Sequence, residues 1–84
     1  MQLIVGNERG VHGRVATRLA EIAAEYGVVL HVCRGEEIVE CTSILDVLAL
    51  ALVQGTTISV LAEGLRAEAA LAAAAHLILS QDNP

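Results

Sequence analysis

Lysine is absent from this chain of 84 residues, and all five of its strongly basic side chains are arginines. Ten acidic residues outnumber them and leave a formal net charge of −5 at pH 7. A surface of this sign repels nucleic acids and anionic membranes, so we expect neither of them as a partner.

Aromatic residues are nearly absent too, since Tyr26 is the only one, although apolar residues make up 55% of the chain. The core must therefore be built from leucine, isoleucine, valine and many alanines. Such small side chains fill little volume. We expect residues 1–84 to form a single domain that is stable only if its helices pack closely on a sheet.

The N-terminus lacks the basic and apolar segments of a secretion signal, and the longest apolar run, residues 47–53, is too short to span a bilayer. Cys33 and Cys41 lack the spacing of a metal site, and we expect no metal and no other cofactor. These features predict a soluble cytoplasmic protein with reduced thiols.

Apolar periodicity predicts an alternation of strands and helices. We expect strands over residues 1–5, 28–34, 37–41 and 57–62, helices over residues 15–26, 44–53 and 66–79, and a tail over residues 80–84. Gly27 should end the first helix, and Gly55 should close the second. The order β-α-β-β-α-β-α with short connections predicts an α+β fold, with one four-stranded antiparallel sheet and three helices on a single face.

Alternation along the strands divides their side chains between the two faces of the sheet. The residues expected to face the core are Leu3, Val5, Leu30, Val32, Val39, Cys41, Ile58, Val60 and Ala62. His31, Cys33, Ile38 and Glu40 then lie on the opposite face, so we expect no intramolecular disulfide. His31, Cys33 and Glu40 share that face, but strand residues of this kind more often have no joint role than hold a metal.

The segment Gly10-Val11-His12-Gly13-Arg14 joins the first strand to the first helix. A helix start has N–H groups without partners and a partial positive charge, which suits an anion. Arg14 adds a guanidinium whose donors fit phosphate oxygens, and the imidazole of His12 keeps one nitrogen lone pair free. These residues predict a histidine that accepts a phosphoryl group, although an exposed loop without chemistry is the simpler interpretation of them alone.

The same segment resembles the active-site signature of HPr, the family of histidine-containing phosphocarriers of the bacterial phosphotransferase system. The resemblance continues in Thr42-Ser43-Ile44-Leu45, in Gln54-Gly55-Thr56-Thr57 and in Ala62-Glu63-Gly64, and so covers almost the whole chain. It implies an HPr-like domain with the fold of an open-faced β-sandwich. It also implies that His12 takes a phosphoryl group on Nδ1 from phosphorylated enzyme I and passes it to enzyme IIA of the sugar phosphotransferase system. Arg14 would stabilise the phosphate of this carrier, which is not an independent turnover enzyme.

Two positions depart from the family pattern beside the predicted acceptor. Most relatives have proline where this chain has Val15, and a larger residue where it has Gly13. Val15 restores an N–H group that can reach the phosphate, whereas Gly13 loosens the backbone next to His12. We expect the chemistry to survive, with the rate of transfer left open.

Ser43 is predicted to cap the second helix, with Asp46 in its first turn. The resemblance gives Ser43 a second role, as the residue that HPr kinase/phosphorylase modifies in bacteria that have this enzyme. One alternative function is therefore a regulatory interaction module controlled by phosphorylation of Ser43, without sugar transport. Another is a small ligand-binding domain, which would require an apolar pocket.

The second helix has more apolar residues than one inward stripe can bury. With Val47 and Leu50 inward, Leu45, Leu48 and Leu52 are left as an exposed patch near His12, and such patches often mark partner surfaces. The resemblance implies that enzyme I and enzyme IIA dock on this face of a monomer. The docking residues that it implies are Thr17, Leu45, Leu48 and Ala49.

Overall fold

Seven elements follow one another in the predicted order in the computed structural model, which describes residues 1–80. They are β1 (Gln2–Ile4), α1 (Gly13–Tyr26), β2 (Val29–Arg34), β3 (Glu37–Glu40), α2 (Ile44–Ala49), β4 (Thr57–Glu63) and α3 (Ala67–Leu79). Of the tail expected over residues 80–84, only Ser80 falls within the described residues.

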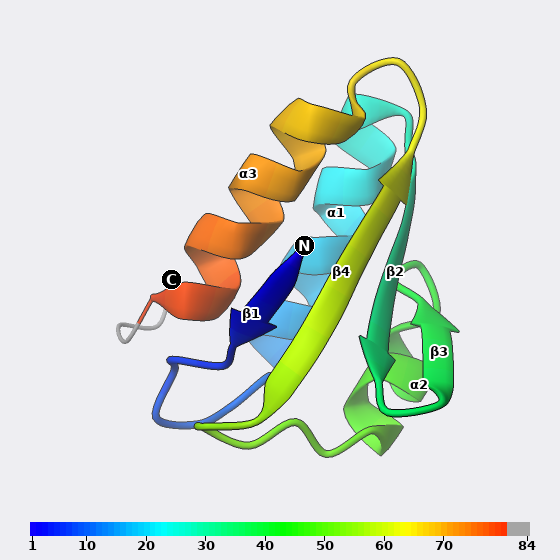
Figure 1. Cartoon of the computed structure of the whole chain (residues 1–84). Coiled ribbons are helices and arrows are strands. Elements are labelled where there is room, and N and C mark those ends of the chain that lie inside the picture. Colours follow the sequence, from blue (N-terminus) through cyan, green and yellow to red (C-terminus); the bar gives the residue numbers. More distant parts are fainter. Residues whose placement is uncertain (81–84) are drawn as a thin grey trace.

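The four strands form one antiparallel sheet in the order β1-β4-β2-β3. Leu3 on β1 pairs with Ile58 on β4, and the neighbouring pairs run through the sheet without a break in register. Figure 1 shows α1 and α3 side by side behind this sheet and the short α2 beneath β3. The α+β fold with helices on a single face, predicted from the order of the elements, is confirmed.

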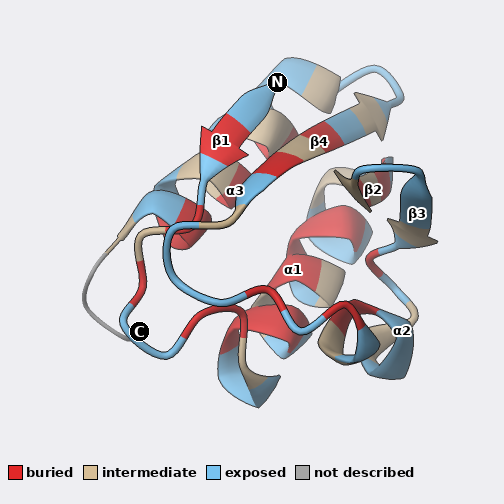
Figure 2. Ribbon diagram, turned by 60° about the horizontal axis from the view of Figure 1, so that its bottom comes forward, coloured by how far each residue is buried: buried red, intermediate tan, exposed pale blue. Residues whose placement is uncertain are grey.

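The core fills the space between the sheet and the helices, where the buried parts of the chain in Figure 2 meet. Its largest fully buried side chains are aliphatic: Leu19, Ile22, Leu30, Leu50, Ile58 and Ile78. The one aromatic residue stays at the border of the core. Tyr26, the last residue of α1, is half-buried, and the guanidinium of Arg66 lies 4.4 Å from the centre of its ring. This cation–π contact ties the end of α1 to the start of α3.

α1 begins and ends at residues that favour helix boundaries. It starts at Gly13, two positions before the predicted start, because His12 already acts as its N-cap. Gly27 ends it as predicted, with a φ of 62° in the left-handed region and its N–H donating to the carbonyl of Ala24. A residue other than glycine adopts this conformation only at a cost, which is why glycine so often ends a helix.

α2 is shorter than predicted, since it ends at Ala49 and not at residue 53. Ala51, with a φ of 52°, turns the chain out of the helix, and its N–H closes the last turn on the carbonyl of Leu48. The carbonyl of Leu52 then accepts a hydrogen bond from the N–H of Val11 at 2.8 Å. A continued helix would direct this carbonyl along its own axis, so the long-range contact overrides the apolar periodicity.

Gly55 was predicted to close α2, and this prediction is wrong. Gly55 has a φ of 90° and lies in the turn before β4, where its N–H donates to the carbonyl of Val5 at 2.8 Å. The N–H of Val5 in turn donates to Thr56 at 2.9 Å. The glycine therefore serves the pairing of the loop with the end of β1.

The two cysteines lie on opposite faces of the sheet, as predicted, and both are free thiols. Cys33 is half-exposed on the face that the helices leave open, whereas Cys41 is 0% exposed in the core. Burial, together with the nearby charges of Glu40 and Cys33, raises the pKa of the Cys41 thiol to about 12. Cys33 is therefore the thiol that a reagent can reach in the folded protein.

Alkaline pH should destabilise the fold through Cys41. An exposed thiol in the unfolded chain loses its proton near pH 8.5, whereas the buried thiol keeps it to about pH 12. The contribution of the Cys41 thiol to the free energy of unfolding is thus complete below pH 8.5 and declines as the pH rises. At pH 10 the free energy of unfolding should be lower by about 2 kcal/mol. Urea unfolding between pH 7 and 10 should show this decline in the wild type and in Cys33→Ala, but not in Cys41→Ala. Equal pH dependence in all three proteins would contradict it.

Candidate functional site

His12 occupies the N-cap position of α1, with an extended backbone. Its Nδ1 accepts a hydrogen bond from the N–H of Arg14 at 3.3 Å, and its carbonyl accepts from the N–H of Ala16 at 2.9 Å. A ring nitrogen that accepts from a backbone N–H carries no proton, so the neutral imidazole has its proton on Nε2. The lone pair of Nδ1 therefore faces the first turn of α1, where N–H groups and the helix dipole favour an anion.

A buried asparagine holds the loop that leads to His12. Asn7 is 2% exposed, and its side-chain oxygen accepts the N–H of Arg9 at 2.9 Å. Its carbonyl accepts the N–H of Gly10, also at 2.9 Å. The sequence analysis placed this segment in a turn-rich loop but missed the role of Asn7. The signal was an asparagine three residues before a glycine, a pattern that suits a side chain bonded to its own turn.

The segment after α2 supports the same loop from the other side. Gly10 has a φ of 68°, and a Cβ atom on it would stand 2.2 Å from the carbonyl oxygen of Leu52. The N–H of Val11 donates to this oxygen, and Nε2 of Gln54 donates to the carbonyl of Gly6 at 3.1 Å. Leu52 and Gln54 are therefore positioning residues for His12. Gln54 belongs to a segment that resembles the family, but the sequence analysis gave neither residue this role.

Arg14 and Thr17 lie in the first turns of α1, and both are exposed. The hydroxyl of Thr17 donates to the carbonyl of Gly13 at 2.8 Å, which directs this side chain back toward the start of the helix. The structure thus brings the two predicted residues to the same end of α1 as His12.

The apolar patch predicted on the second helix is smaller than expected. Leu45 is 79% exposed and Ala49 is exposed, but Leu48 is only half-exposed because it packs against the core. The prediction that Leu52 is exposed is wrong, because its side chain is only 3% exposed in the loop beyond the shortened helix. The accessible part of the patch therefore consists of Leu45, Ala49 and the outer part of Leu48.

Ser43 is the N-cap residue of α2, as predicted, but its side chain does not cap the backbone. Its hydroxyl donates instead to the carboxylate of Asp46 at 2.7 Å, and the hydroxyl of Thr42 donates to the carboxylate of Glu40. A phosphate on Ser43 would stand beside the negative charge of Asp46. This repulsion disfavours modification of the folded chain at Ser43.

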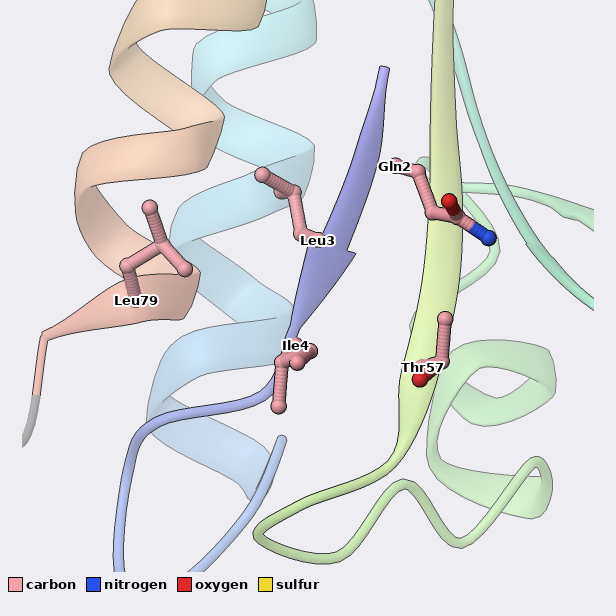
Figure 3. A pocket seen from close by; sticks show the side chains of 5 residues that line it. All are labelled: Gln2, Leu3, Ile4, Thr57 and Leu79. Carbon is pink, nitrogen blue, oxygen red and sulfur yellow. The ribbon is translucent and has the colours of Figure 1, made fainter.

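An open apolar hollow of about 620 Å³ lies elsewhere, between β1 and the last turn of α3. Figure 3 shows that Leu3 and Leu79 flank it from these two elements. Its lining residues are Gln2, Leu3, Ile4, Thr57 and Leu79. None of them is charged or belongs to the predicted site, so the hollow offers a ligand little beyond apolar contact.

Residues 1–80 bear on two features that the sequence analysis did not expect, a metal site and a membrane-spanning helix. No three His, Cys, Asp or Glu side chains in this range are placed to hold a metal ion. None of the helices in it is both long and apolar enough to cross a bilayer.

Comparison with known proteins links this geometry to one family. The family model described as "PTS HPr component phosphorylation site" matches residues 1–80. The chain is 36% identical over 77 residues to phosphocarrier protein NPr of Shewanella violacea. This match covers 92% of the present chain and 85% of the relative.

Solved structures agree with this assignment. HPr from Bacillus anthracis superposes with a TM-score of 0.86 at 26% identity, over 93% of both chains. HPr from Thermoanaerobacter tengcongensis superposes with a TM-score of 0.84 at 27% identity, over 93% of this chain and 88% of that one.

Two glycines beside His12 should respond to alanine in opposite ways. A Cβ on Gly13 meets no atom within 4 Å, so Gly13→Ala should stabilise the chain by about 0.5–1 kcal/mol by removing freedom from the unfolded state. Gly10→Ala combines a positive φ with a clash against Leu52 and should cost more than about 1 kcal/mol. Urea unfolding of both variants tests this, and a stable Gly10→Ala would show that the loop does not need the close approach.

Proposed function

The chain belongs to the HPr family of phosphocarriers of the phosphotransferase system, and on this premise we propose that His12 is its phosphoryl acceptor. In this proposal Nδ1 of His12 receives the group from phosphorylated enzyme I and passes it to an enzyme IIA domain of a sugar phosphotransferase system. The observation that carries the proposal is the orientation of Nδ1 toward the first turn of α1.

The transfer requires one bond to form and one to break. The lone pair on Nδ1 of His12 attacks phosphorus, and the electron pair of the breaking N–P bond returns to the histidine of enzyme I. N–H groups at the start of α1 and the guanidinium of Arg14 balance the charge on the transferred group. The hydrogen bond from the N–H of Arg14 to Nδ1 is long, at 3.3 Å. An incoming phosphoryl oxygen can therefore replace Nδ1 as the acceptor of this N–H.

The site is open, which suits a carrier. His12 is half-exposed and Arg14 is exposed, so the phosphoryl group would stay accessible to the next protein. A deep pocket with many donors would hold the phosphate too tightly to release it. We further propose that Thr17, Leu45, Leu48 and Ala49 form the docking face for both partners, in a cycle that takes place in the cytoplasm.

The alternative of a regulatory module depends on modification of Ser43 by HPr kinase/phosphorylase. The hydrogen bond from Ser43 to Asp46 speaks against it, because the kinase would have to break this bond and place a phosphate beside a carboxylate. The carrier function is therefore the one that the geometry favours.

Enzyme I and phosphoenolpyruvate should add one acid-labile, alkali-stable phosphate to the wild-type chain, the stability expected of a phosphohistidine. His12→Ala should take up none, and Arg14→Gln should react about 100-fold more slowly, because it removes a charged donor from the transferred group. Ser43→Ala is the matched control and should behave as the wild type. Mass spectrometry of the intact chain and a thermal melt of each variant provide the measurements. A phosphate that persists in His12→Ala would refute the assignment.

Val15→Pro tests whether the N–H of Val15 contributes to the site. This N–H belongs to the first turn of α1, where proline is tolerated because no intrahelical acceptor is available. Loss of one charge-assisted hydrogen bond should shift the phosphoryl equilibrium toward enzyme I by about tenfold.

The control for this test is Val15→Ala, which keeps the N–H and loses the buried side chain. The equilibrium is read from the phosphorylated fraction at several ratios of enzyme I to carrier. If the proline and alanine variants gave the same fraction, the N–H of Val15 would have no part in holding the phosphate.

A further inference from the structure

Three of the five arginines are engaged with groups of the chain itself. Arg18 donates to Glu25 at 2.7 Å and to Glu21 at 3.5 Å, Arg34 donates to Glu37 at 3.1 Å, and Arg66 lies over Tyr26. Arg9 and Arg14 lie on either side of His12 in the sequence. Arg14 is already part of the proposed phosphate site, which leaves Arg9 without an assigned role.

Arg9 is an exposed cation on a well-held loop. The N–H of Arg9 is bound by the buried Asn7, so the position of its backbone is fixed. Within residues 1–80 its guanidinium makes no ion pair with a carboxylate. Because this chain carries twice as many acidic as basic residues, an arginine without such a partner is noteworthy.

An exposed apolar side chain adjoins this loop. A Cβ atom built on Gly10, the residue after Arg9, would stand 2.9 Å from the Cα atom of Val53, so the two segments touch. Val53 is 64% exposed. Figure 1 shows the loop after β1 and the segment before β4 side by side at one end of the molecule. The loop that carries His12 thus presents a cation, and the adjoining segment before β4 presents an apolar side chain beside it.

We propose that Arg9 and Val53 form a second docking contact, for a protein partner that presents carboxylates around its own phosphoryl-carrying histidine. The inference rests on the proposed function. A chain of net charge −5 that carries a phosphoryl group repels an acidic partner at long range. Arg9, an exposed cation three residues before His12, makes the charge less negative where the two histidines must meet. Such a contact raises the rate of association, and salt screens it.

The second-order rate constant for phosphoryl transfer from phosphorylated enzyme I measures this effect. At about 20 mM salt, Arg9→Gln should lower it by about three- to tenfold, and the loss should disappear at about 0.5 M salt, where screening acts within a few ångströms. Transfer within the saturated complex should not change, because Arg9 does not contact the reacting atoms. The substitution keeps the backbone N–H that binds Asn7, so the loop is retained.

Two further variants accompany this test. Arg66→Gln is the matched control. It removes the same charge at the opposite end of α1, because Arg66 contacts the last residue of this helix whereas His12 caps its first turn. The rate constant of Arg66→Gln should equal that of the wild type at both salt concentrations. Val53→Ser removes an apolar contact, which salt does not screen, and should lower the rate constant at both concentrations.

The contrary outcomes are distinct. An equal loss for Arg9→Gln at low and high salt, or a loss within the saturated complex, would place Arg9 on the phosphoryl group and overturn the docking role. No loss at either salt concentration would overturn it as well. A wild-type chain that takes up no phosphoryl group on His12 would instead overturn the proposed function, and this inference with it.

Discussion

The hydrogen bond from the N–H of Val11 to the carbonyl of Leu52 is the constraint on which the site depends. It joins two loops that are far apart in the sequence. Gly10 can approach the Leu52 carbonyl only because it has no side chain, and α2 must end before Leu52 so that this carbonyl can accept the N–H of Val11. With the loop held in this way, His12 enters α1 as its N-cap and directs Nδ1 to the first turn. The position of the imidazole thus depends on a backbone contact with another segment of the chain.

Charge is distributed in a way that suits a carrier protein. Ten acidic residues against five arginines make the charge negative at a distance, and three of the arginines are held by nearby carboxylates or by Tyr26. The two arginines that flank His12 in the sequence change the balance locally, where the proposed function requires an anion to be received and released. Exposed charges in water contribute little binding energy, which would keep a phosphoryl group transferable, yet they act on approaching proteins before contact.

The local signals of the sequence predicted much of the fold correctly. Strand alternation identified Leu30, Val32, Ile58 and Val60 as core residues, and Gly27 marked the end of α1, because both signals arise within a few neighbouring residues. The length of α2 was predicted incorrectly for the opposite reason. Residues 44–53 have the composition of a helix throughout, and nothing within them reveals that Leu52 will bond to Val11.

The sequence by itself determined the order of the elements, the acidic surface and the identity of the predicted acceptor, since His12 and Arg14 stand in a short contiguous motif. Only the tertiary structure decided what holds that motif. Asn7 supports it through hydrogen bonds to its own turn, whereas Leu52 and Gln54 support it through hydrogen bonds that reach across the chain. Leu52 is buried where an exposed residue was expected. Local propensity depends on adjacent residues, whereas the contacts of Leu52 and Gln54 depend on how distant segments pack, so the motif around His12 alone could not predict them.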